Sequence, residues 1–354
     1  MSRARCFQAA VISLLLGVTQ VPQVAGRTAT PAQRPAAQGH NINGMTVSTP
    51  RGSAEWGKDA IVGTITELKQ LGVNWISIHP YARIGRDGSV SWRRGEGDDT
   101  ATAPTWLRRP IEEAHRQGLK IFIKPHLGHW GSFSWRGEIA FDTEAEWQRF
   151  FDGYRQWITA IATFSHDADA FAVGTELDKT VGHEADWREV IRAVREEYGG
   201  PLTYAANWTD YERIPFWDAL DAIGVQAYFP VLEDSGNTDR LPPQEAFDAG
   251  WVRIMDRMRA FSERYGKTVV FTELGYNRSA RAPYEPWAYE VGGPNADELQ
   301  ERCMRAALRA LEGEPSVVGA FLWKWFPGDA RPRDFEMSST AMRQVISRYW
   351  NVNG

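Results

Sequence analysis

Short apolar runs alternate with longer amphipathic segments along most of this chain. Eight of the short runs are rich in Val, Ile, Phe, Tyr and Trp and apolar nearly throughout, which is typical of strands buried on both faces of a parallel sheet. These runs cover residues 44–48, 73–80, 119–126, 168–176, 202–207, 222–229, 268–273 and 317–325. Between them, apolar residues recur at three- and four-residue spacing, which predicts amphipathic helices. The clearest of these segments are 143–164, 184–198, 244–265 and 296–311.

This order of segments predicts an α/β fold, a single (β/α)8 TIM barrel over residues 40–354. Eight strands, seven intervening helical segments and a last helix at 339–349 are the elements of a closed barrel. The helix expected after the fifth strand, at 215–220, is short and only weakly marked. An open, doubly wound sheet shows the same alternation and is the alternative.

The connecting segments differ in length according to their direction. Connections from helix into strand are short, at 71–72, 117–118, 199–201 and 266–267. Connections from strand into helix are long, at 81–103, 127–142, 231–243 and 275–294. Elaborate loops therefore gather at the C-terminal face of the predicted barrel, where barrel enzymes place their active sites.

The composition narrows the classes of partner. A net charge of -5 without any Lys/Arg-rich block argues against a nucleic-acid partner. Trp is frequent, with 16 copies, many of them at predicted strand ends and in loops. Aromatic faces in such places suit stacking on the apolar faces of sugar rings, whereas the other Trp side chains are expected to pack in the core.

The N-terminal residues predict export. Arg3 and Arg5 precede an apolar run, 9–18, that is too short to span a bilayer, which is typical of a secretory signal peptide. We expect a signal at 1–26, a flexible leader at 27–39, and a secreted or periplasmic protein. Cys6 would be lost with the signal, so Cys303 would have no disulfide partner. No other apolar stretch is long enough for a membrane span.

Two of the predicted strands end in a glutamate. Glu176 closes the fourth strand and Glu273 closes the seventh. A terminal carboxylate on a buried apolar strand is costly to desolvate unless it is paired or functional. Helix capping or a salt bridge would explain either residue alone. Two such residues at one barrel mouth favour a reaction in which both carboxylates take part. Two carboxylates that face a sugar can perform retaining glycoside hydrolysis, in which one attacks the anomeric carbon and the other acts as acid and then base.

The placement of these two glutamates resembles that of the clan A glycoside hydrolases. Within the clan, the chain looks most like the family 113 β-mannanases, from Asn43 to about Trp350. The resemblance rests on Lys124-Pro-His126, Gly174-Thr-Glu176, Gln226-Ala-Tyr228, Phe271-Thr-Glu-Leu-Gly275 and Trp323-Lys-Trp325, in this order and at these strand positions. It implies that Glu176 is the acid/base and Glu273 the nucleophile of a retaining enzyme. It also implies a β-1,4-mannan substrate and no metal or other cofactor.

The chain departs from the clan pattern at one position. Most members have Asn directly before the acid/base, whereas this chain has Thr175. The usual partner of the sugar 2-hydroxyl is therefore missing, and Asn207, at the end of the fifth strand, is our candidate replacement. Tyr228 resembles the clan tyrosine that hydrogen-bonds the nucleophile, although a core tyrosine would also fit the pattern.

Further polar and aromatic residues near strand ends are candidates for substrate contact. Lys124 and His126 end the third strand, where we expect them to contact sugar hydroxyls. Trp323 and Trp325 lie two residues apart on the eighth strand, so their side chains are expected on the same face. At least one should face inward as a platform on which a sugar ring stacks. Trp130 lies in the loop after the third strand and is expected to wall a substrate groove.

Three other interpretations fit parts of the pattern. His79, His126 and His129 fall near strand ends, as in barrel metallohydrolases, but the first strand offers no His pair, which disfavours a metal site. A carbohydrate-binding barrel without catalytic activity is a rival of a different class. The same retaining mechanism on another β-linked glycan, such as a glucan, is the nearest alternative. We expect a monomer whose partner is a polysaccharide or oligosaccharide.

Overall fold

The computed structural model describes residues 42–92, 102–233, 241–328 and 334–351. The predicted signal peptide and leader lie outside the described residues. The described ranges belong to one compact unit that extends from Gly39 to Gly354. In these ranges, no helix is long and apolar enough to cross a membrane.

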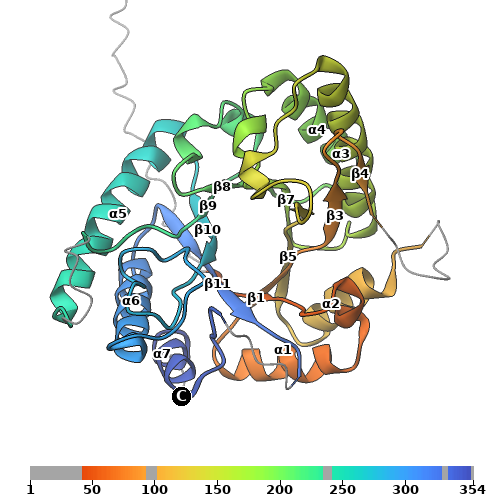
Figure 1. The fold of residues 1–354 in the computed structure, drawn as a ribbon. Coiled ribbons are helices and arrows are strands. Elements are labelled where there is room, and N and C mark those ends of the chain that lie inside the picture. Colours follow the sequence, from red (N-terminus) through yellow and green to blue (C-terminus); the bar gives the residue numbers. More distant parts are fainter. Residues whose placement is uncertain (1–41, 93–101, 234–240, 329–333, 352–354) are drawn as a thin grey trace, which may run out of the picture. The chain divides into compact units, whose positions relative to one another are not determined.

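Eight parallel strands close into a barrel in the order β1-β11-β10-β9-β8-β7-β5-β2 (Figure 1). The predicted (β/α)8 barrel is therefore confirmed, and the open doubly wound sheet is excluded. The strands are β1 (Ile42–Val47), β2 (Trp75–Ile78), β5 (Lys120–Ile123), β7 (Ala170–Thr175), β8 (Leu202–Asn207), β9 (Ile223–Gln226), β10 (Val269–Leu274) and β11 (Val317–Trp325).

Seven α-helices surround the barrel in the described part of the chain (Figure 1). They are α1 (Ala60–Gln70), α2 (Thr105–Arg116), α3 (Glu144–Phe164), α4 (Glu184–Glu197), α5 (Gln244–Tyr265), α6 (Ala296–Leu311) and α7 (Thr340–Trp350). Local sequence sets their ends. Thr143 and Glu146 form a reciprocal capping box at the start of α3, and Gly266, in the left-handed conformation at φ 64°, ends α5.

The weakly marked fifth helix does not form. The chain between β8 and β9 instead makes two short 3-10 turns, Tyr211–Arg213 and Trp217–Ala219. Pro215 lies between them and interrupts any continuous helix there, because proline lacks the backbone donor and clashes with the preceding turn. Trp217 is fully buried and donates to the carbonyl of Tyr211 at 2.8 Å. This segment is therefore held in place by side-chain packing and not by a regular helix.

A small sheet stands beside the barrel, mostly in segments predicted as loops, although the sequence pattern places His126 at the end of the third barrel strand. It contains β3 (Tyr81–Ile84), β4 (Val90–Ser91) and β6 (His126–Gly128), in the order β4-β3-β6. Because β2 ends at Ile78 and β5 ends at Ile123, the residues that follow these strands leave the barrel. The backbone after β2 and after β5 is therefore held in a second sheet.

The bottom of the barrel is filled by apolar side chains. Phe122, Ala172, Val270 and Phe321 form a separate buried cluster there, with the rings of Phe122 and Phe321 5.0 Å apart. Gly44 makes room for this cluster, since a Cβ atom at this position would lie 2.4 Å from the Phe321 ring. The cluster closes the barrel below, so polar side chains can gather only at the C-terminal ends of the strands.

Candidate active site

Two carboxylates stand together at the C-terminal end of the barrel. Glu176 directly follows β7, and Glu273 lies near the end of β10. Both line one cavity of about 640 Å³. Glu176 has a left-handed backbone with φ 51°, a conformation that non-glycine residues rarely adopt and that clusters at functional sites. The structure thus brings the two predicted glutamates into one cavity.

Glu273 is buried and held by two donors. Tyr228 donates its hydroxyl proton to Oε2 at 2.7 Å, and the Lys124 ammonium contacts Oε1. Burial raises the pKa of Tyr228 well above its ordinary value, as does the negative charge of Glu273, so the phenol keeps its proton and remains a donor. These contacts hold the Glu273 carboxyl group in a fixed position.

Glu176 has a different environment. Its side chain is 13% exposed, and its nearest cationic partner is Arg136, with 3.8 Å between Nη1 and Oε2. Burial raises the pKa of Glu176, and the negative charge of Glu273 adds to this shift. The positive charges of Arg136 and Lys124 act against it. A carboxyl group with a raised pKa next to an ionised one is the combination that acid–base catalysis requires.

Histidine and tryptophan rings pack against the Glu273 side of the cavity. His126 Nε2 lies 3.7 Å from Glu273 Oε1, and the His126 ring stacks on His79 with 5.0 Å between centroids. Trp323 lies against both His rings, and the Lys124 ammonium lies 5.1 Å from the centre of the Trp323 ring. Burial lowers the pKa of both histidines well below the ordinary value, as does the charge of Lys124.

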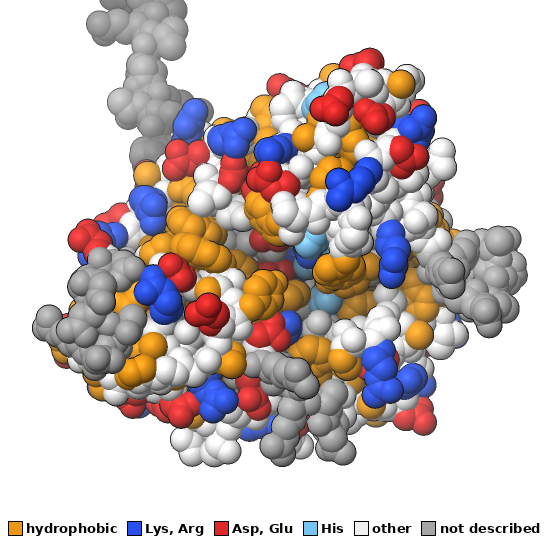
Figure 2. All heavy atoms as spheres, viewed as in Figure 1, with side chains coloured by type: hydrophobic (Ala, Val, Ile, Leu, Met, Phe, Trp, Pro, Cys, Tyr) orange, Lys and Arg blue, Asp and Glu red, His pale blue; other side chains and the backbone are white. Residues whose placement is uncertain are grey.

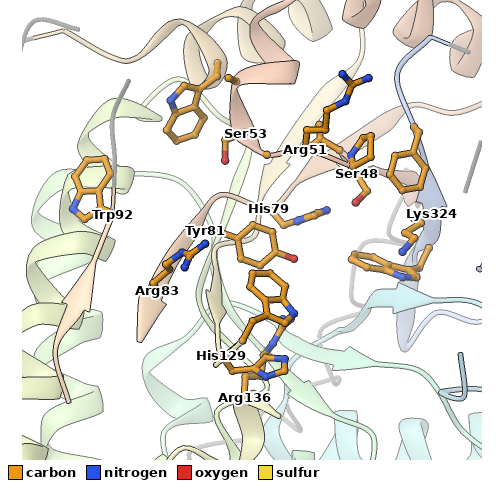
Figure 3. A pocket seen from close by; sticks show the side chains of 18 of the residues that line it. Ser48, Arg51, Ser53, His79, Tyr81, Arg83, Trp92, His129, Arg136 and Lys324 are labelled. Carbon is orange, nitrogen blue, oxygen red and sulfur yellow. The ribbon is translucent and has the colours of Figure 1, made fainter. Parts of the chain in front are cut away.

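A second, larger cavity of about 1280 Å³ adjoins the first. Arg136, Tyr289 and Trp323 line both cavities, so the two form one elongated depression across the barrel mouth. Figure 2 shows this face hollowed at its centre, with hydrophobic side chains around the hollow and His side chains inside it. Figure 3 shows the larger cavity, with His79 and Tyr81 at its centre and Arg136 beside His129.

The remaining candidates divide between the two cavities. Asn207 lines the smaller cavity together with Glu176, and its side-chain oxygen accepts from the backbone and hydroxyl of Thr209 at 3.2 and 3.1 Å. Trp130 lines the larger cavity and is 61% exposed. Thr175, where the clan has Asn, turns its hydroxyl to the carbonyl of Pro125 at 2.9 Å and so links β7 to the chain after β5.

Lys124 is fully buried and pairs with Glu273, so it is not a solvated strand end, and its contact with sugar hydroxyls stays a prediction. One expectation needs correction. Trp325 is 2% exposed and packs against Arg343 of α7, with the guanidinium 4.5 Å from the ring centre. Trp325 is therefore not a sugar platform. The pairing of β11 with β1 shifts by one residue between Met45 and Val47, which reverses the face that the following side chain takes.

The structure adds cavity residues that no sequence pattern indicated. Arg136 lies in a 3-10 turn, Arg136–Glu138, within the loop after β6. Tyr289 and Trp287 come from the long loop after β10, and Trp287 stacks on Trp208 with 5.3 Å between centroids. Loop residues of this kind carry no periodicity, and only the unusual length of their loops could have indicated a functional role.

Among the described residues, no group of three or more His, Cys, Asp or Glu side chains is placed to hold a metal ion. Cys303 is buried in α6 and forms no disulfide with another described residue. The groups that face one another at the barrel mouth are two carboxylates, a buried lysine, a tyrosine and two histidines. Paired carboxylates of this kind at the top of a (β/α)8 barrel are typical of glycoside hydrolases.

Comparison with known proteins gives the family. The model of Glycoside Hydrolase Family 113 matches residues 45–338, so the chain belongs to this family and is a glycoside hydrolase. The family 113 β-mannanase AaManA from Alicyclobacillus acidocaldarius, solved in complex with ManMIm, is 26% identical, with a TM-score of 0.74 over 88% of this chain and 97% of that chain. A comparison with curated proteins found no match.

Two further structures support the fold. A second family 113 β-1,4-mannanase is 22% identical and has a TM-score of 0.75, with 88% of this chain and 99% of that chain covered. A family 5 mannosidase from Rhizomucor miehei is 11% identical, with a TM-score of 0.59 and coverage of 88% and 92%. The resemblance to the family 113 β-mannanases expected from the strand motifs is thus confirmed.

Proposed function

We propose that this glycoside hydrolase is a β-1,4-mannanase that retains the anomeric configuration, with Glu273 as nucleophile and Glu176 as acid/base. The observation that carries the proposal is the contrast between the two carboxylates in one cavity. Glu273 contacts Lys124 and Tyr228, whereas burial raises the pKa of Glu176. Family membership and the mannanase activity named for the similar structures support the substrate class.

In the first half-reaction, the ionised Glu273 attacks the anomeric carbon and forms a covalent glycosyl–enzyme bond. Glu176 donates its proton to the glycosidic oxygen, so the bond between this oxygen and the anomeric carbon breaks and the leaving chain departs as a neutral alcohol. Lys124 and Tyr228 contact the attacking carboxylate and keep it aligned. Glu176 holds the required proton because burial raises its pKa.

In the second half-reaction, the roles of Glu176 and Glu273 change. Glu176 is now ionised and accepts a proton from a water molecule, whose oxygen attacks the anomeric carbon. The bond to Glu273 breaks, and this carboxylate and the protonated Glu176 are regenerated. Two inversions at the same carbon leave a product with the β configuration of the substrate.

The shape of the barrel mouth suits a chain-like substrate. The two adjoining cavities together extend well beyond the pair of carboxylates. Trp130 lines the larger cavity, Trp208 and Trp287 line the smaller one, and Trp323 lines both. Aromatic faces spaced along an open groove can stack on successive sugar rings, which supports action on a polysaccharide over action on a small glycoside.

The substrate assignment is tested by the ratio of kcat/KM for β-1,4-manno-oligosaccharides and for cello-oligosaccharides of equal length. We expect at least about a tenfold preference for the manno series, or about 1.4 kcal/mol in the transition state. Mannose has an axial 2-hydroxyl, and a site built to bind a hydroxyl rejects analogues that leave its own polar groups unpaired. Equal rates, or a preference for the gluco series, would contradict the mannan assignment but leave the mechanism intact.

NMR of the first product formed tests the mechanism separately. A β anomer before mutarotation is expected, and an initial α anomer would show that the enzyme inverts. A carbohydrate-binding barrel without catalytic activity would give neither product, and turnover of dyed polysaccharides separates this rival from the enzyme.

A further inference from the structure

Arg136 lies between His126, which packs beside Glu273, and Glu176. Its Nη1 atom is 2.7 Å from His126 Nδ1 and 3.8 Å from Glu176 Oε2. The Arg136 side chain is 11% exposed, so the guanidinium makes these contacts largely out of water. His126 is only 1% exposed, and this pair is therefore a fixed part of the cavity wall.

The contact determines which nitrogen of His126 carries the proton. A guanidinium has only donors, so Nδ1 of His126 must accept through its lone pair. Burial and the positive charges of Arg136 and Lys124 lower the pKa of His126 well below the ordinary value, so the ring is neutral. A neutral ring with an accepting Nδ1 carries its proton on Nε2.

The Nε2 atom of His126 points toward the reacting carboxylate. It lies 3.7 Å from Glu273 Oε1, which is longer than a hydrogen bond, and it has no hydrogen-bond partner among the described residues. The His126 ring packs against the rings of His79, Tyr81 and Trp323, so it cannot turn away without repacking. A buried donor in this position suits an acceptor that arrives with the substrate.

On the basis of the proposed function, we propose that Arg136 is a positioning residue that fixes the Nε2–H tautomer of His126, so that this proton donates to a sugar hydroxyl beside Glu273. Without Arg136 the neutral ring could place its proton on Nδ1, and Nε2 would become an acceptor. The bound sugar would then face a lone pair where it needs a donor. Arg136 thus sets the donor pattern of the site through its contact with His126.

The first test is 15N NMR of the histidine side chains in the full chain, with the His126 signals assigned from the His126→Gln variant. We expect a protonated Nε2 and an unprotonated Nδ1 across pH 5–8. In Arg136→Met, we expect a mixture of tautomers or titration near neutrality. The ionisable groups that face the ring are Lys124, Arg136, Glu273, His79 and Tyr81. An Nδ1–H tautomer in the wild type would overturn the proposal, and this measurement needs no substrate.

The second test is a double-mutant cycle on whichever glycan the enzyme hydrolyses. Glutamine can present its side-chain amide near the Nε2 position and donates without tautomer control. We expect Arg136→Met to lower kcat/KM on the order of a hundredfold in the wild type, as for loss of a transition-state donor, and at least tenfold less in His126→Gln. Equal losses in both backgrounds would show that Arg136 acts independently of His126.

Two controls separate positioning from general structural damage. Arg192→Met removes an equally long cation from the outer face of α4, where Arg192 pairs with Glu189 and Glu196, and we expect no change in kcat/KM. Thermal unfolding of each variant reports whether the barrel is intact. If the enzyme proves inactive on every glycan, the proposed function fails, whereas the NMR measurement still decides the tautomer.

Discussion

The ends of β7 and β10 supply the same functional group to one cavity but surround it differently. At β10, Glu273 is buried and contacted by Lys124 and Tyr228. At β7, Glu176 has a left-handed backbone, a partly exposed side chain and a contact of 3.8 Å with Arg136. A carboxylate with close donors is stabilised in its charged form, whereas a buried carboxyl without them favours its neutral form. The surroundings, and not the residue type, therefore distinguish the two proposed roles.

The largest effect is expected at Glu273, the carboxylate that contacts Lys124 and Tyr228. Glu273→Ala removes the proposed nucleophile, so kcat should fall by at least about 10⁴-fold on every substrate. Added azide should restore turnover and yield the inverted α-glycosyl azide, which NMR identifies. Glu196→Ala, on the solvent-facing side of α4, is the matched control and should behave like the wild type. Near-normal activity of Glu273→Ala would place the nucleophile elsewhere.

A smaller and substrate-dependent loss is expected at the other carboxylate. Glu176→Ala removes the proposed proton donor, so hydrolysis of the natural polysaccharide should fall by about 10²–10⁴-fold. Aryl glycosides with good leaving groups need no protonation and should still form the glycosyl–enzyme. With azide, the product should keep the β configuration. If the azide products of Glu273→Ala and Glu176→Ala had the same anomeric configuration, the two carboxylates would not have different roles.

The hydrogen bond between Tyr228 and Glu273 should contribute less than either carboxylate. Tyr228→Phe removes the 2.7 Å bond to Oε2 and leaves the contact with Lys124. We expect kcat to fall by about 10- to 100-fold, the equivalent of about 1.5–3 kcal/mol for a hydrogen bond to a charged group. Steady-state kinetics with a thermal-unfolding control measure this effect, and an unchanged kcat would show that Lys124 alone orients the nucleophile.

The smallest effect concerns stability. Because burial raises the pKa of Glu176 in the folded state, its charged form destabilises the fold once the pH rises through that pKa. Glu176→Gln should therefore raise the Tm by roughly 1–3 °C at alkaline pH, and the difference should vanish at acid pH, where both side chains are neutral. Calorimetry over a pH series checks this. A Tm gain of equal size at pH 4 would point to a packing effect.

The amino-acid sequence alone is enough to predict the barrel and the position of its two carboxylates. Strands buried on both faces must be apolar nearly throughout, so eight apolar runs separated by amphipathic segments leave one closed architecture as the best solution. A glutamate at the end of such a run emerges at the C-terminal face whatever the details of packing. Glu176 and Glu273 can for this reason be recognised from the order of residues along the chain.

Which side chains meet across the barrel mouth depends on the tertiary structure. Lys124 pairs with Glu273 across 149 residues of sequence, and no local pattern encodes such a contact. The orientation of Trp325 depends on a register shift between β11 and β1, which parity along one strand cannot reveal. Arg136 enters from an aperiodic loop. Periodicity records whether a residue is buried, whereas the partner that it finds depends on how distant strands and loops are brought together.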